Sequence, residues 1–157
     1  MAKEERTLII IKPDAMQRSL VGEIIGRFER KGLKIVGLKM LQLSDVLLQE
    51  HYVHHVDKPF FTELKRFMQS APVVVMALSG VNAVKACRVV AGQTYGAEAA
   101  AGTIRGDLSM STQANIVHAS DSPETAVQEI KRFFSDGELL DYQKCEIEFI
   151  YSTDERA

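Results

Sequence analysis

Short, continuous apolar runs alternate along the chain with stretches in which apolar residues recur every three or four positions. The continuous runs at residues 8–11 and 73–78 have the length of buried strands. Helical spacing of apolar residues predicts helices over residues 20–28 and 123–134. Residues 145–151 alternate without an obvious partner, so we expect them to pack on the surface. Further helices are predicted at residues 45–52, 60–68 and 81–91.

Two more strands complete the predicted sheet. Residues 33–43 have apolar side chains in both alternating phases, which predicts a strand buried on both faces, with Gly37 at a bulge. Residues 115–118 predict a short fourth strand, and residues 92–113 predict a long loop. Four strands separated by helices favour an α+β fold, a ferredoxin-like βαββαβ sandwich with a four-stranded antiparallel sheet covered by helices. No repeat or linker divides the chain, so a single domain over residues 1–157 is expected.

Composition and charge narrow the class of protein. A hydrophobic fraction of 46% and a charged fraction of 25% are typical of a globular protein. A net charge of -2 gives no bulk attraction to nucleic acid or acidic membranes, so we expect neither a primary nucleic-acid role nor a membrane role. Cys87 and Cys145 lie far apart without metal-ligand spacing, and the apolar run near the N-terminus is too short for a signal peptide. These features predict a cytoplasmic protein.

A single histidine, His118, lies where the predicted fourth strand leads into the last helix. Asp121 and Ser122 are typical N-cap residues, and Pro123 suits the first helical position. Unpaired backbone N–H groups at such a helix start attract anions. A polar residue in a connecting turn is the simpler interpretation, and His118 alone does not exclude it.

Glu129 follows on the same predicted helix, at the border of its apolar stripe. A carboxylate there could bond one ring nitrogen of His118 and leave the other free as a nucleophile. On spacing alone, a solvated glutamate paired with Lys131 or Arg132 is the favoured interpretation.

Phosphoryl transfer to a histidine also needs positive charge near the transferred oxygens. Lys12 ends a buried strand, Arg88 lies in an apolar helix, and Arg105 lies in the "GTIRGD" turn. Each one alone is typical of a snorkelling or capping residue. Convergence of all three on one histidine would indicate a phosphate site, without any P-loop motif.

The other three histidines, in "HYVHH", allow an alternative chemistry. His51, His54 and His55 have spacings that could ligate zinc on a helix, but no fourth ligand follows, so a protein-bound metal is not expected. Two other classes of function remain open on these residues: a regulatory module that binds nucleotide without turnover, and a nucleic-acid-binding protein, which the charge disfavours.

Four stretches together resemble the nucleoside diphosphate kinase family: "TLIIIKPDAMQRSLVGEII", "HYVHHVDKPFF", "GTIRGD" and "NIVHASDS", followed by Glu129. The resemblance runs from about residue 5 to residue 151. It implies a ping-pong exchange, in which the γ-phosphoryl of a nucleoside triphosphate moves to a histidine and then to a nucleoside diphosphate. It also implies Mg²⁺ as cofactor, held mainly by the nucleotide phosphates and not by a protein metal site.

The resemblance assigns roles by motif. His118 is the phosphorylated residue, Glu129 holds its ring, and Ser120 lies close to the site. Lys12 and Asn115 are expected at the sugar 3′-hydroxyl, with Lys12 also reaching the phosphates. The other substrate-binding residues are Arg88, Thr94 and Arg105 at the phosphates, Phe60 and Leu64 at the base, and Tyr52 near the phosphates and His118.

The resemblance further implies a homohexamer, with a tetramer less favoured, built from a common dimer. The C-terminal tail is like that of hexameric members. The loop over residues 92–107 departs from the family pattern, because Gly96 and Ala101 replace prolines and Tyr95 replaces an asparagine. Ala119 likewise stands where glycine is usual, and Thr112 where an aliphatic residue often lines the base cleft.

Overall fold

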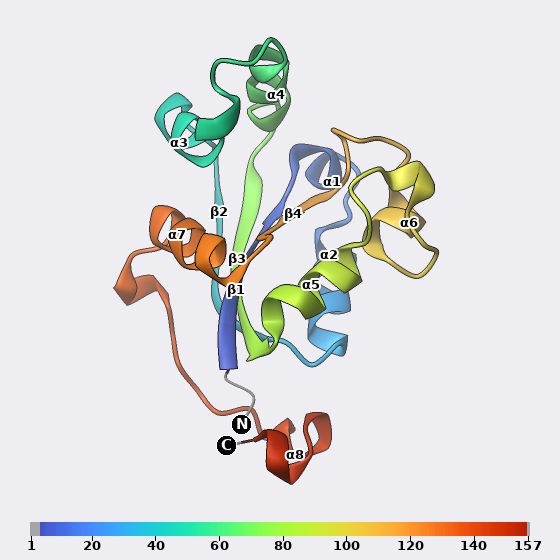
Figure 1. Cartoon of the computed structure of the whole chain (residues 1–157), viewed down its shortest axis with the longest axis vertical. Coiled ribbons are helices and arrows are strands. Elements are labelled where there is room, and N and C mark those ends of the chain that lie inside the picture. The colour runs from blue at the N-terminus through green and yellow to red at the C-terminus, as the bar shows by residue number, and fades with distance from the viewer. Residues whose placement is uncertain (1–3, 157) are drawn as a thin grey trace.

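A four-stranded sheet forms the centre of the computed structural model, which describes residues 4–156 (Figure 1). The strand order is β2-β3-β1-β4, and every neighbouring pair is antiparallel. This confirms the predicted α+β fold; residues 1–3 and 157, which the single-domain prediction includes, lie outside the described residues. The strands are β1 (Glu4–Ile11), β2 (Lys34–Leu41), β3 (Val73–Val81) and β4 (Val117–Ala119).

Helices cover both faces of the sheet, as Figure 1 shows. Ile9 and Ile11 of β1 pack with α2 (Val21–Arg30) and α5 (Ala83–Ala91). Leu8 and Ile10 point the other way and pack with α3 (Asp45–His51) and α7 (Pro123–Phe133). Because β1 is buried on both faces, its sequence is a continuous apolar run and not an alternating one. The other helical segments are α1 (Pro13–Gln17), η1 (Val53–His55), α4 (Phe61–Met68), η2 (Gly96–Glu98), α6 (Ile104–Leu108), η3 (Asp136–Glu138), α8 (Ile147–Ile150) and η4 (Thr153–Glu155).

Strand β2 lies at the edge of the sheet, and here the prediction of burial on both faces is wrong for the second half of the strand. Leu38 is 51% exposed and Met40 is 65% exposed. The predicted bulge is confirmed, since the register with β3 shifts between Ile35 and Gly37. A side chain at Gly37 would meet Phe134 and Leu139, so close packing explains the glycine.

Two segments hold more regular structure than the sequence pattern indicates. The predicted loop over residues 92–113 contains η2 and α6, and the turn after β1 forms the short helix α1. Pro13 at the first position of α1 is the one signal of that helix. Within residues 4–156, no helix is both long and apolar enough to cross a membrane.

The C-terminal tail packs on the surface, as predicted. It lies against one end of the sheet in Figure 1, where the Tyr151 hydroxyl accepts a hydrogen bond from the Val81 N–H at 3.1 Å. Further up, the Leu140 N–H donates to the Val36 carbonyl at 2.8 Å, so the tail covers the first half of the free β2 edge. The second half of that edge, which carries the exposed Leu38 and Met40, is not covered by this contact.

Candidate active site

A strained turn leads into β4. Ile116, directly before the strand, has a φ of 77°, which β-branched residues rarely adopt. Its N–H donates to the Asp14 carboxylate at 3.0 Å, and its carbonyl accepts from the Lys12 N–H at 2.9 Å. The segment after β1 therefore holds this backbone in place, and such maintained strain is common at functional sites.

His118 lies in the middle of β4, opposite Ile10 of β1. The helix start that follows is as predicted, since the Ser122 side chain caps α7 by accepting from the Thr125 N–H at 3.1 Å. One face of α7 therefore turns toward the histidine.

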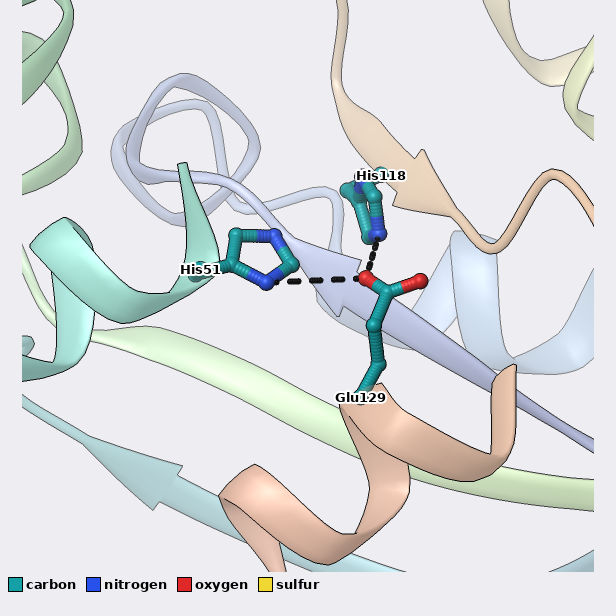
Figure 2. Close-up of side chains that lie close together, drawn as sticks. All are labelled: His51, His118 and Glu129. Carbon is teal, nitrogen blue, oxygen red and sulfur yellow. Dashed lines mark hydrogen bonds and ion pairs between the residues drawn. The ribbon is translucent and has the colours of Figure 1, made fainter. Parts of the chain in front are cut away.

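Glu129 is on that face and is only 3% exposed. Its Oε2 bonds Nε2 of His118, which leaves Nδ1 of the ring as the available nucleophile (Figure 2). The interpretation of Glu129 as a surface glutamate paired with Lys131 or Arg132 is therefore wrong. At the border of the apolar stripe, the Glu129 side chain faces the sheet, and its carboxylate bonds His118 there.

His51, at the end of α3, is a third member of this cluster that the sequence analysis did not place. Its Nδ1 lies 3.5 Å from Glu129 Oε2, and its side chain is 4% exposed. Its ring stands edge-on to the His118 ring, with 4.7 Å between centroids. Burial, helped by the charges of His118, Arg132 and Lys12, lowers the pKa of His51 to about 2, so this imidazole stays neutral.

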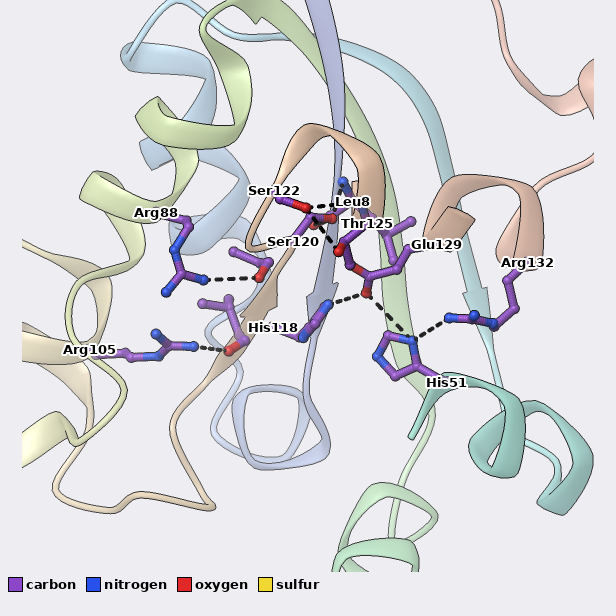
Figure 3. A network of polar contacts seen from close by, with 12 residues as sticks. Leu8, His51, Arg88, Arg105, His118, Ser120, Ser122, Thr125, Glu129 and Arg132 are labelled. Atoms are coloured by element: carbon purple, nitrogen blue, oxygen red, sulfur yellow. Dashed lines mark hydrogen bonds and ion pairs between the residues drawn. The ribbon is translucent and has the colours of Figure 1, made fainter. Parts of the chain in front are cut away.

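Two arginines are anchored on the carbonyls on either side of His118 (Figure 3). Arg105 Nη2 donates to the Val117 carbonyl at 2.6 Å, and Arg88 Nη1 donates to the Ala119 carbonyl at 3.4 Å. Burial and the neighbouring Arg88 lower the pKa of Arg105 to about 10, so it remains charged at neutral pH. The structure therefore brings both arginines to the backbone on either side of His118.

Lys12 brings the third positive charge. Its Nζ donates to the Asn115 Oδ1 at 2.6 Å, and the Asn115 amide donates to the Thr94 carbonyl at 2.9 Å. Burial, followed by repulsion from Arg105, lowers the pKa of Lys12 to about 8. Lys12 therefore loses its proton at a mildly alkaline pH.

This pKa gives a direct expectation for the pH dependence of nucleotide binding. A bound polyphosphate favours the charged form of Lys12, so affinity for ADP should fall as pH rises from about 7 to about 9. Calorimetry at about pH 8.5 should also show proton uptake on binding, measured as a dependence of the apparent enthalpy on buffer ionisation. A Lys12→Met variant is the control, and it should lose both effects. An equal pH dependence in that variant would contradict the assignment.

A cleft of about 870 Å³ joins these groups. Phe60, 49% exposed and 5.4 Å from the His55 ring, offers a flat face to a base. Tyr52 packs edge-on to His51, and burial and the Glu129 charge raise its pKa, so its hydroxyl stays protonated. The predicted site residues that line the cleft are Lys12, Tyr52, Phe60, Leu64, Arg88, Thr94, Arg105, Asn115, His118 and Glu129.

Ser120 is the predicted site residue that the structure places close to His118 but outside the cleft lining. It does not line the cleft, and its hydroxyl bonds both backbone groups of Leu8, accepting from the N–H at 3.2 Å and donating to the carbonyl at 3.4 Å. Side chains two residues apart in a strand share a face, but the Ser120 hydroxyl is occupied by β1. Ser120 therefore fastens β4 to β1 close to His118.

Within residues 4–156, one group of three side chains has its potential metal-ligand atoms close together: His51, His118 and Glu129. Two of the three ligand atoms are nitrogens, whereas Mg²⁺ prefers oxygen. The Arg132 guanidinium also lies 3.2 Å from Nδ1 of His51, which disfavours any cation there. The group does not fit Mg²⁺, and the "HYVHH" histidines do not gather as a zinc site: His54 and His55 lie outside this group.

Comparison with known proteins agrees with this geometry. The family model described as nucleoside diphosphate kinase matches residues 5–139. The chain belongs to the nucleoside diphosphate kinase family. It is 54% identical over 151 residues to a nucleoside diphosphate kinase of Parabacteroides distasonis, covering 96% of this chain and 99% of that protein. It is 52% identical over 151 residues to nucleoside diphosphate kinase A of Rattus norvegicus, with the same coverage.

A solved structure supports the same family. A halophilic nucleoside diphosphate kinase from Halobacterium salinarum in complex with CDP has a TM-score of 0.92 and 41% identity, and the match covers 95% of this chain and 99% of that chain. As a nucleoside diphosphate kinase, the protein is an enzyme that transfers phosphate between nucleotides.

Proposed function

We propose that the enzyme works by a ping-pong mechanism through a phosphohistidine at His118. The observation that carries the proposal is the placement of Glu129 on Nε2 of a histidine flanked by two anchored arginines. A carboxylate on Nε2 favours the tautomer whose Nδ1 lone pair is free, and it offsets the positive charge that the ring gains on phosphorylation.

In the first half-reaction, the Nδ1 lone pair forms a bond to the γ-phosphorus of a nucleoside triphosphate. The bond between that phosphorus and the β,γ-bridging oxygen breaks, and the nucleoside diphosphate leaves with the electron pair. In the second half-reaction, a terminal oxygen of another nucleoside diphosphate attacks the phosphohistidine, and Nδ1 recovers its lone pair. Nε2 keeps its proton throughout because Glu129 accepts its hydrogen bond.

The substrate is placed by the cleft residues. Phe60 stacks on the base beside Leu64, Lys12 and Asn115 meet the sugar 3′-hydroxyl, and Arg88, Thr94 and Arg105 bind the phosphates with Tyr52 nearby. Among the described residues no group of three carboxylates gathers to hold Mg²⁺, so the ion would be held mainly by phosphate oxygens. Asp121, a carboxylate that lines the cleft, would be available to its water shell. Bound Mg²⁺ would neutralise phosphate charge.

Incubation with γ-labelled ATP tests the mechanism. The protein should take up label that is lost in acid and retained in alkali, as expected for phosphohistidine. Addition of unlabelled GDP should discharge the protein and yield labelled GTP. Transfer of label from ATP to GDP without a labelled protein, at any time on the millisecond scale, would refute the covalent step.

The sugar contact predicts the behaviour of modified donors. Lys12 is buried and uses one of its three N–H donors on Asn115, so a nucleotide without a 3′-hydroxyl leaves another of these donors without that partner. We expect 3′-deoxy-ATP to label the protein at least about tenfold more slowly than ATP. 2′-Deoxy-ATP is the matched control and should react at close to the ATP rate. Equal rates for all three donors would contradict the placement.

We also propose a homohexamer working in the cytoplasm, with a tetramer as the alternative. Support comes from the exposed apolar side chains of Leu38 and Met40 on the free β2 edge, and from Tyr95 and Met110, 43% and 81% exposed, in the segment after α5. Light scattering across a dilution series should give six chains at high concentration. Dissociation to dimers on dilution would support a threefold contact that is weakened by the loss of the loop prolines. A tetramer at every concentration would contradict the hexamer.

A further inference from the structure

Arg132 lies three residues after Glu129 on α7, a spacing that makes two helical side chains neighbours. Within residues 4–156, however, no ion pair joins this guanidinium to the carboxylate. Arg132 Nη1 instead donates to Nδ1 of His51 at 3.2 Å. A cation thus lies close to Glu129 without forming the ion pair that would draw the carboxylate away from His118.

His51 is the group that separates the two charges, as Figure 3 shows. Its Nδ1 lies 3.2 Å from Arg132 Nη1 and 3.5 Å from Glu129 Oε2. Phe133, 5.3 Å away between ring centroids, packs edge-on to the imidazole and fixes its place. A neutral imidazole that accepts at Nδ1 carries its proton on Nε2, and this buried nitrogen has no partner among the described residues. Among the described residues, the bond from Arg132 is therefore the hydrogen bond that the His51 imidazole makes.

We propose that His51 is a positioning residue, which holds the Arg132 guanidinium at Nδ1 and thereby keeps the Glu129 carboxylate on Nε2 of His118. This inference rests on the proposed role of His118 as phosphoryl acceptor. Without an acceptor at the Nδ1 position, Arg132 turns to its neighbour Glu129 on the same helix. The carboxylate is then shared, and a smaller fraction of molecules has the His118 ring in the orientation and tautomer that leave its Nδ1 free.

Two amides at position 51 test the role of a single nitrogen. The side chain of His51→Asn places its amide near the Nδ1 position and can accept from Arg132, whereas that of His51→Gln extends its amide toward the Nε2 position. The readout is the rate of His118 labelling by γ-labelled ATP at saturating ATP, together with the ATP concentration that gives half of that rate. We expect His51→Asn to stay within about threefold of the wild type and His51→Gln to be roughly ten- to hundredfold slower. The half-saturating ATP concentration should change little in either variant.

Removal of the Arg132 guanidinium, which should turn to Glu129 in His51→Gln, provides the decisive comparison. Arg132→Leu, added to His51→Gln, should restore most of the lost labelling rate, because no guanidinium then competes for Glu129. Lys131→Leu, which removes an exposed cation from the same helix turn, should not restore it. A structural role for His51 alone predicts no such rescue, because removing Arg132 does not refill the space around position 51.

The outcomes separate this inference from the proposed mechanism. Wild-type protein that takes no label on His118 refutes the mechanism itself. Wild-type labelling with equal rates in His51→Asn and His51→Gln, or with no rescue by Arg132→Leu, overturns the role of His51 only. If His51→Gln does not fold, as judged by its thermal unfolding, His51→Phe with and without Arg132→Leu provides the same comparison, because Phe fills the imidazole space without an acceptor.

Discussion

His118→Ala is expected to lose nucleoside diphosphate kinase activity by roughly four orders of magnitude or more, because the variant lacks the atom that forms the covalent bond. Binding should survive, since Lys12, Arg88 and Arg105 remain in the cleft. The fold should survive as well, because β4 is held to β1 by backbone pairing and the His118 side chain is 24% exposed. The measurement is the initial rate of GTP formation from ATP and GDP, with ADP affinity determined in parallel.

A second histidine makes the matched control. His54 is an exposed residue of η1 that lines the cleft but whose side chain forms no hydrogen bond with the described residues, so His54→Ala should retain exchange within about twofold of the wild type. His118→Ala that keeps even a tenth of the wild-type rate would exclude a phosphohistidine at this position. Loss of ADP binding in the same variant would instead indicate that the cleft has collapsed.

The fold follows from patterns that are local in the sequence. Residues 8–11 and 73–78 are continuous apolar runs because β1 and β3 lie between two helical layers. The pattern wrongly predicted burial of the second half of β2, because an apolar residue such as Met40 gives the same pattern in a buried strand and at an exposed edge. The short helix α1 offers less than two turns of periodicity, which is too little for pattern analysis.

The site is a different case, because its members come from elements that only tertiary packing brings together. Spacing on α7 alone favoured a surface Glu129 paired with Lys131 or Arg132, because the histidine that it bonds lies on another element. His51 ends α3, and nothing in residues 45–52 indicates that this helix end meets β4. The family resemblance supplied the pairing of His118 with Glu129, but not the place of His51.

Arg105→Lys is expected to be among the most destabilising conservative substitutions in the chain. The Arg105 side chain is buried, and its guanidinium donates to three carbonyls: Asn115 at 3.1 Å, Gly92 at 2.9 Å and Val117 at 2.6 Å. These bonds tie α6 to the end of α5 and to β4, and they leave two of the five guanidinium N–H groups for a phosphate.

A lysine cannot reproduce this fork, since its three donors share one nitrogen on a flexible stem. Two of the three carbonyls that accept from Arg105 should lose their hydrogen-bond donor, at about 1–3 kcal/mol each, so the free energy of unfolding should fall by about 2–6 kcal/mol. Exchange activity should also fall, because the carbonyl of Val117 lies directly before His118. Chemical denaturation at one fixed protein concentration measures the first effect.

Arg18→Lys is the control: Arg18 is exposed and donates to a single carbonyl, of Leu108, so its loss should cost less than about 0.5 kcal/mol. If both variants unfold at the same denaturant concentration, the buried fork does not stabilise the segment that carries His118.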